Sequence, residues 1–274
     1  MFQWAAVASQ LIQDPPGHFG YSKKRCINHL LKLSTNRNGQ DPLDELYKEV
    51  LEGYFTDQEA RLLFRSVVGQ LITSIEPLSI RSLTTLRRHS DDDDDDDDDD
   101  GDGVVILLRR LGSLLSNVNS SDEDLPIIPL HTSFRDFLTN KEKSGEFCVG
   151  LRDAHRQLAH SCLNVLLKDL KFNICNLETS YLANKDVTDL SSRVDKHIPP
   201  FLLYACRFWD DHLEHIGFET DLFGKLRTFF EKKLLFWLEA LSLTNYMGLA
   251  STACSALNVW LASGQGVSRI LLLI

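Results

Sequence analysis

The sequence predicts a mainly α-helical chain of 274 residues, with short helices and a small β-hairpin near its middle and an α-helical arm after them. Three observations predict this class. Apolar residues recur at intervals of three and four positions over most of the chain, as they do on the buried face of a helix. Proline and polar runs break this pattern between residues 77 and 138, where short elements alternate. From Leu151 onward the helical spacing returns, without a repeat of fixed period.

Residues 1–76 are predicted to form a first helical segment. Apolar faces occur within residues 23–33 and 41–51. Thr56 and Glu59 then have the spacing of a capping box, in which side chain and backbone satisfy each other at a helix start. The long helix that follows is expected to end before Pro77, because proline cannot continue a helix.

Residues 77–145 are predicted to form a winged-helix-like domain with an acidic loop at 89–103. Helices are expected at 80–86 and 103–111, on either side of that loop. Two apolar segments, 114–118 and 125–130, flank a polar turn and predict a β-hairpin. Helices followed by a hairpin are the element order of a winged helix.

Residues 146–263 are predicted to form a second helical domain, and residues 264–274 a disordered tail. Helices are expected at 151–170, 199–216, 223–241 and 248–261. Trp209, Trp237 and Trp260 lie within these helices together with several phenylalanines, and packing in the core is the default interpretation of this aromatic set.

The whole charge imbalance comes from one tract. The chain has 29 Lys and Arg against 39 Asp and Glu, for a net charge of -10, and ten consecutive aspartates run from Asp91 to Asp100. The remainder is neutral, which disfavours a nucleic-acid binder driven by overall basicity. The tract is interpreted as a solvated low-complexity insertion, and its role is left open.

Cysteine usage and hydropathy predict a cytoplasmic location. The six cysteines are scattered and form no CxxC pair, so reduced thiols are expected. The apolar N-terminus lacks the basic residues of a signal peptide. No apolar run approaches the roughly 20 residues of a membrane span, so no membrane partner is expected.

Known motifs for phosphate and metal binding are missing from this sequence. It contains no GxxxxGK[ST] loop, no GxGxxG and no HExxH, so the chain alone is not expected to be an enzyme or to hold a cofactor. His212 and His215 are three residues apart at the end of an expected helix, but no third ligand is placed near them. The prediction is therefore that there is no metal site.

The most informative stretch is residues 130–138, with the sequence LHTSFRDFL. Ser133 and Asp136 have the spacing of a second capping box, so a helix should begin here with Phe134 and Phe137 turned inward. His131 would then lie beside a helix N-terminus, where free N–H groups attract phosphate. From the residues alone, a packed or solvated histidine remains the default interpretation.

This stretch resembles the histidine-containing motif that opens a helix in the winged-helix domain of NACHT-type STAND NTPases, which are NLR-like signalling proteins. Residues 4–8, 43–47 and 64–69 are similar to the end of the NACHT core and the segments adjoining it. Residues 170–182 and 204–213 resemble the helical region that follows in the NACHT and WD-repeat proteins of mushroom-forming fungi. The resemblance covers roughly residues 1–265.

The resemblance implies a non-catalytic regulatory portion of a signal-transduction protein switched by ADP and ATP. In that family the motif histidine, here His131, contacts the β-phosphate of ADP. The nucleotide and its Mg would belong to the complete protein, and the implied partners are its own NACHT core and a homo-oligomer. Because the groups that position a phosphoryl transfer are missing, hydrolysis by this chain is not expected. The chain looks like a truncated gene model or a degenerate copy.

Two alternatives from other functional classes remain. One is a stand-alone helical module that binds another protein through its amphipathic faces. The other is a winged-helix nucleic-acid binder that uses Arg109 and Arg110 at the end of a recognition helix. The acidic tract nearby would repel a phosphate backbone and disfavours the second alternative.

Overall fold

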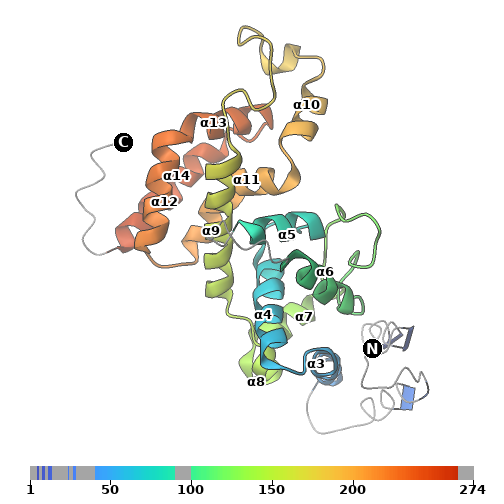
Figure 1. Ribbon diagram of the computed structural model, residues 1–274. Helices are drawn as coiled ribbons and strands as arrows, with labels where there is room; N and C mark the ends of the chain where they lie inside the picture. Colours follow the sequence, from blue (N-terminus) through green and yellow to red (C-terminus); the bar gives the residue numbers. More distant parts are fainter. Residues whose placement is uncertain are drawn as a thin grey trace. The chain divides into compact units, whose positions relative to one another are not determined.

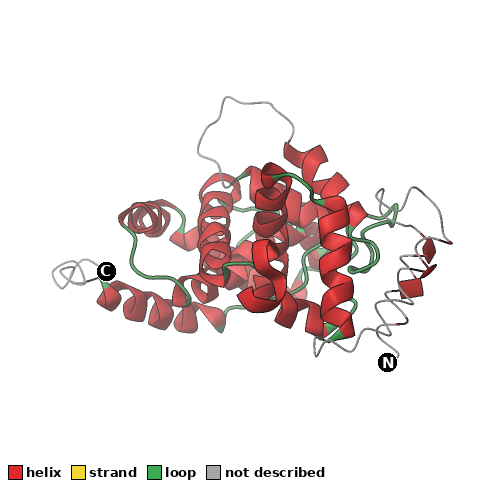
Figure 2. Cartoon of the chain, turned by 90° about the horizontal axis from the view of Figure 1, so that it is seen from below, coloured by secondary structure: helices red, strands yellow, loops and turns green. Residues whose placement is uncertain are grey.

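The computed structural model describes residues 41–89 and 100–264, together with eight helical positions between Ala5 and Asn28. Within these residues the chain has twelve α-helices and two 3-10 turns and no strand (Figure 2). The mainly α-helical class is therefore confirmed, whereas the winged helix with its β-hairpin is wrong. Three predicted features lie mostly or wholly outside the described residues. They are the helix at 23–33, the acidic tract and the tail from residue 265.

The chain divides into two compact units, whose helices are labelled in Figure 1. The described part of unit 1 comprises residues 41–73, 77–84 and 100–154, and that of unit 2 comprises residues 74–76, 85–89 and 155–264. Helices that lie wholly in unit 1 are α3 (Pro42–Tyr54), α4 (Gln58–Thr73), α6 (Asp100–Arg110), α7 (Thr132–Thr139) and α8 (Lys141–Ser144), followed by the 3-10 turn η2 (Gly145–Phe147). Those wholly in unit 2 are α10 (Leu190–His197), α11 (Pro200–Glu214), α12 (Thr220–Lys232), α13 (Leu234–Leu243) and α14 (Leu249–Ser263), with the 3-10 turn η3 (Asn184–Asp186) before them. Helices α5 (Ile80–Arg88) and α9 (Leu151–Asp169) contribute residues to both.

Side-chain caps fix where the first helices of unit 1 begin. The carboxylate of Asp41 accepts a hydrogen bond from the N–H of Leu43 at 3.0 Å, and Pro42 follows it in the first turn of α3. At α4 the carboxylate of Asp57 accepts from the N–H of Ala60 at 2.7 Å. The sequence assigned this cap to Thr56, one residue too early.

Aromatic side chains from α3, α4, α7 and η2 form the core of unit 1. The ring of Tyr47 on α3 lies 5.1 Å from that of Phe134 and 5.4 Å from that of Phe137, both on α7. Phe64 on α4 packs edge-on against Phe147 at 5.5 Å. Because such rings bury large apolar areas, they fix α7 firmly against α3.

The segments predicted as a hairpin run side by side but form only isolated bridges. One bridge pairs Leu115 with Pro129 and another pairs Ser79 with Pro126. Each proline lacks the N–H that a ladder needs at its position. Asn117 adopts a left-handed conformation with φ of 63°, which turns the chain out of extended geometry. The sequence pattern identified the apolar segments correctly, but the prolines prevent a strand.

Unit 2 packs α11, α12, α13 and α14 around a tryptophan core. The rings of Trp209 and Trp237 lie 6.0 Å apart, and the indole N–H of Trp237 donates to the carbonyl of Cys206 at 2.8 Å. The single helix predicted at 223–241 is wrong, because the chain breaks at Lys233 into α12 and α13. The break lets Trp237 reach the core beside Phe229, whose ring is 5.8 Å away.

Candidate functional site

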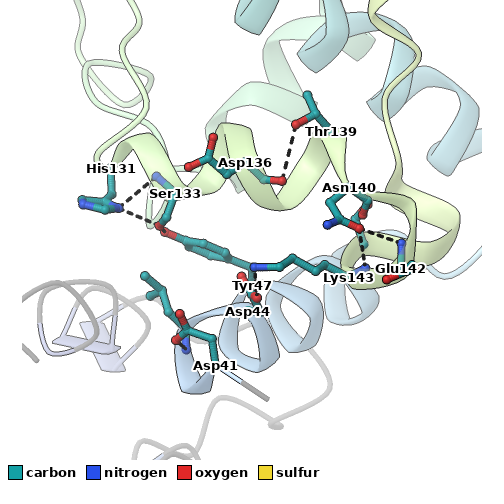
Figure 3. A network of polar contacts seen from close by, with 12 residues as sticks. Asp41, Asp44, Tyr47, His131, Ser133, Asp136, Thr139, Asn140, Glu142 and Lys143 are labelled. Atoms are coloured by element: carbon teal, nitrogen blue, oxygen red, sulfur yellow. Dashed lines mark hydrogen bonds and ion pairs between the residues drawn. The ribbon is translucent and has the colours of Figure 1, made fainter. Parts of the chain in front are cut away.

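His131 caps the N-terminus of α7 (Figure 3). Its backbone is extended, with φ of −149° and ψ of 143°, and its ring atom Nδ1 accepts a hydrogen bond from the N–H of Ser133 at 3.0 Å. The sequence assigned the cap to Ser133, so the true cap lies two residues earlier. An imidazole Nδ1 can take this role because it is as close to the backbone as the oxygen of a capping asparagine.

Ser133 and Tyr47 extend the contact into a chain of hydrogen bonds. The hydroxyl of Ser133 lies 2.6 Å from Nδ1 of His131, and the hydroxyl of Tyr47 lies 3.0 Å from that of Ser133. Figure 3 shows the three side chains in line between α7 and α3. Sequence reasoning missed Tyr47, because it lies 86 residues from Ser133 and no local pattern connects them.

An ion pair and a helix cap connect the same helices at the other end of α7. Nζ of Lys143 on α8 lies 2.7 Å from the carboxylate of Asp44 on α3, and this hydrogen bond raises the pKa of the lysine. Asn140 caps α8 by accepting from the N–H of Glu142 at 2.9 Å. Helices α3, α7 and α8 are therefore tied together at both ends of α7 (Figure 3).

The arrangement presents one hydrogen-bond donor to the outside. When Nδ1 of His131 accepts the backbone N–H through its lone pair, a neutral ring holds its proton on Nε2. His131 is half-exposed, and it stands at the positive end of the α7 dipole. Such a group suits an anionic oxygen, for which the helix N-terminus adds a favourable field.

His212 and His215 near the end of α11 were considered as metal ligands because they are three residues apart. In the structure they contact other side chains. Nδ1 of His212 lies 2.9 Å from Nδ1 of His155, and Nε2 lies 2.9 Å from the hydroxyl of Tyr204. The ring of His215 stacks on that of His155 at 4.0 Å. Burial, together with the smaller effects of His155 and His215, lowers the pKa of the fully buried His212 to about 3. The residues described include no group of three or more potential ligands that could hold a metal ion.

Arg109, one of the two arginines of the nucleic-acid alternative, lies beside an acidic side chain, and so does Arg81 on α5. Arg109 is 3.7 Å from the carboxylate of Glu123, and Arg81 is 2.8 Å from that of Asp124. These pairs reduce the positive charge that a phosphate backbone would meet. The β-hairpin of the winged helix on which that alternative depended is also missing from the described residues.

Comparison with known proteins yields one distant relative. The chain is 27% identical over 263 residues to the vegetative incompatibility protein HET-E-1 of Podospora anserina. The match covers 88% of this chain but only 18% of HET-E-1, so the chain spans less than a fifth of that relative. No family model matches the sequence, and no solved structure matches it. The match supports a distant relation to this fungal vegetative incompatibility protein.

No helix in the part of the chain that the structure describes combines the length and the apolar character needed to cross a membrane.

Proposed function

We propose that this chain is a non-catalytic regulatory portion of a nucleotide-switched signalling protein of the NACHT type, in which His131 binds a phosphate oxygen of ADP. The observation that carries the proposal is the capping geometry of His131, which leaves Nε2–H as an outward donor at a helix N-terminus. The distant match to a fungal vegetative incompatibility protein supports the same family.

His131 could bind the phosphate of a nucleotide, but the residues around it would not hold the nucleotide's Mg. A neutral imidazole N–H donates to an anionic oxygen, and a hydrogen bond of this charge-assisted kind is worth about 1.5–3 kcal/mol. The nucleotide's Mg and its base would need residues outside this set, because the sequence carries no GxxxxGK[ST] loop. We therefore assign hydrolysis, where it occurs, to a nucleotide-binding core and not to this chain.

Replacing His131 by asparagine separates the two roles of the side chain. Asparagine is among the best N-cap residues, so His131→Asn should keep α7 capped while it removes the Nε2–H donor. In the full-length protein that carries this chain, ADP binding measured by titration calorimetry should weaken about 10- to 100-fold. His131→Ala, which loses the cap as well, should weaken binding and also destabilise unit 1 by about 1 kcal/mol.

Two results would contradict the proposal. One is the lack of any ADP binding by the unaltered full-length protein. The other is an ADP affinity for His131→Asn equal to that of the unaltered protein. Thermal unfolding of the two variants provides the control, because only His131→Ala should lower the melting temperature.

A further inference from the structure

The protonation pattern of His131 follows from the groups around Nδ1. The N–H of Ser133 points to Nδ1 at 3.0 Å, and the hydroxyl of the same residue lies 2.6 Å away. Because Nδ1 already accepts from the backbone, it has no proton to give, and the serine hydroxyl must be the donor in the second contact. Two donors on one residue therefore converge on the same ring nitrogen.

Tyr47 supplies the next donor in the chain. With its proton directed at His131, the oxygen of Ser133 can only accept from the hydroxyl of Tyr47, which lies 3.0 Å away. Tyr47 is 1% exposed, and its ring is fixed against Phe134 at 5.1 Å. Burial raises the pKa of Tyr47, and Asp44 and Asp41 raise it further against the opposing effect of Ser133, so the phenol keeps its proton. Tyr47 therefore donates to Ser133, and both donors of Ser133 are directed at the imidazole.

We propose that Tyr47 and Ser133 are positioning residues that hold His131 in its Nε2–H tautomer, so that the ring presents a proton and not a lone pair to an anionic oxygen. The opposite tautomer would direct the lone pair of Nε2 at the anion, which repels it. The part of this inference that concerns a phosphate rests on the proposed function. The tautomer itself is a property of this chain without any ligand.

The tautomer can be measured by NMR of the ring nitrogens in the whole chain after labelling with isotopic histidine. His131→Asn identifies the His131 signals, because they alone should vanish. In the unaltered chain, Nε2 should carry the proton and Nδ1 should not. Ser133→Ala should raise the ratio of the Nδ1–H to the Nε2–H form about fivefold, the change that one lost hydrogen bond of ~1 kcal/mol produces.

Two further variants separate positioning from general damage to the fold. Ser133→Thr keeps the hydroxyl and should restore the original ratio. Tyr47→Phe keeps the ring that packs on Phe134 but removes the donor that orients the hydroxyl of Ser133. Because that hydroxyl is still present, the ratio of the Nδ1–H to the Nε2–H form should rise by less than in Ser133→Ala. General damage to unit 1 would lower its stability but would not make the ratio of the Nδ1–H to the Nε2–H form highest in Ser133→Ala, lower in Tyr47→Phe and unchanged in Ser133→Thr.

The outcomes distinguish this inference from the proposed function. A proton on Nδ1 in the unaltered chain, or equal ratios in the unaltered chain and Ser133→Ala, would overturn the positioning role whatever binds nearby. Where the tautomer shifts as expected, ADP affinity in the full-length protein should fall for Ser133→Ala and recover for Ser133→Thr. An unchanged ADP affinity for His131→Asn would instead refute the proposed function and leave the tautomer result standing.

Discussion

Acidification should lower the free energy of unfolding, because His212 is buried without a charge in unit 2. His212 is fully buried, and its pKa in the fold lies at about 3. In the unfolded chain a histidine has a pKa of about 6.5. Since the pKa is lower in the fold, the unfolded state takes up the additional proton below about pH 6.5. The free energy of unfolding therefore falls as the pH falls below that value.

The size of the loss follows from the same shift. Each pH unit within the window contributes about 1.36 kcal/mol, so the loss reaches about 2 kcal/mol at about pH 5. This figure requires only that the pKa of His212 in the fold lies below about 5. The contacts with His155 and Tyr204, both at 2.9 Å, give a protonated ring no acidic partner that would raise it.

The assay compares the unaltered chain with His212→Asn by urea unfolding at about pH 7.5 and about pH 5. The variant should be destabilised at both values, but by about 2 kcal/mol less at the lower pH, because only the unaltered chain then loses the contribution of His212. Groups that titrate alike in both proteins cancel in this comparison. Tyr204→Phe, which removes a hydrogen bond but keeps the imidazole, should retain the pH dependence of the unaltered chain. An equal destabilisation by His212→Asn at both pH values would refute the reasoning.

Three other substitutions test separate parts of the structure. Burial and Asp211 raise the pKa of Asp210 to about 7, so the stability that this group contributes is lost as the pH rises from about 4 to about 7. Asp210→Asn should therefore be more stabilising at about pH 8 than at about pH 4 by at least about 2 kcal/mol, roughly half of the full shift. A gain independent of pH in urea unfolding would contradict this. Arg207 bonds both oxygens of Glu76 at 2.6 and 2.7 Å and stacks on two aromatic rings, so Arg207→Lys should cost about 1–2 kcal/mol in thermal unfolding. A double-mutant cycle with Glu76→Gln that showed no coupling would mean that the ion pair contributes nothing. Phe134 is 1% exposed, and Phe134→Ala should destabilise unit 1 by about 3–5 kcal/mol, whereas Phe134→Leu should cost under about 1.5 kcal/mol; similar losses for both would argue against tight packing at this position.

Local sequence signals were sufficient where one stripe of apolar residues faced the core. Helices α3, α4, α9 and α11 lie close to their predicted ranges for that reason. Helix α13 was merged with α12 because its residues are apolar on every side, and such a sequence gives no periodic signal for a boundary. The contact between His155 and His212 joins residues 57 apart, so no spacing rule could have found it.

His131 illustrates how tertiary contacts decide what a local motif means. The sequence offered two capping residues two positions apart, and the usual ranking favours serine. In the structure the hydroxyl of Ser133 lies between Nδ1 of His131 and the hydroxyl of Tyr47 on α3, and the N–H of Ser133 donates to the same Nδ1. Since Tyr47 reaches α7 only through the packing of α3, the position of the imidazole proton depends on that packing. A rearrangement that separated α3 from α7 would remove one donor from the chain and favour the opposite tautomer, so Tyr47→Phe tests the link between the fold and the presented proton.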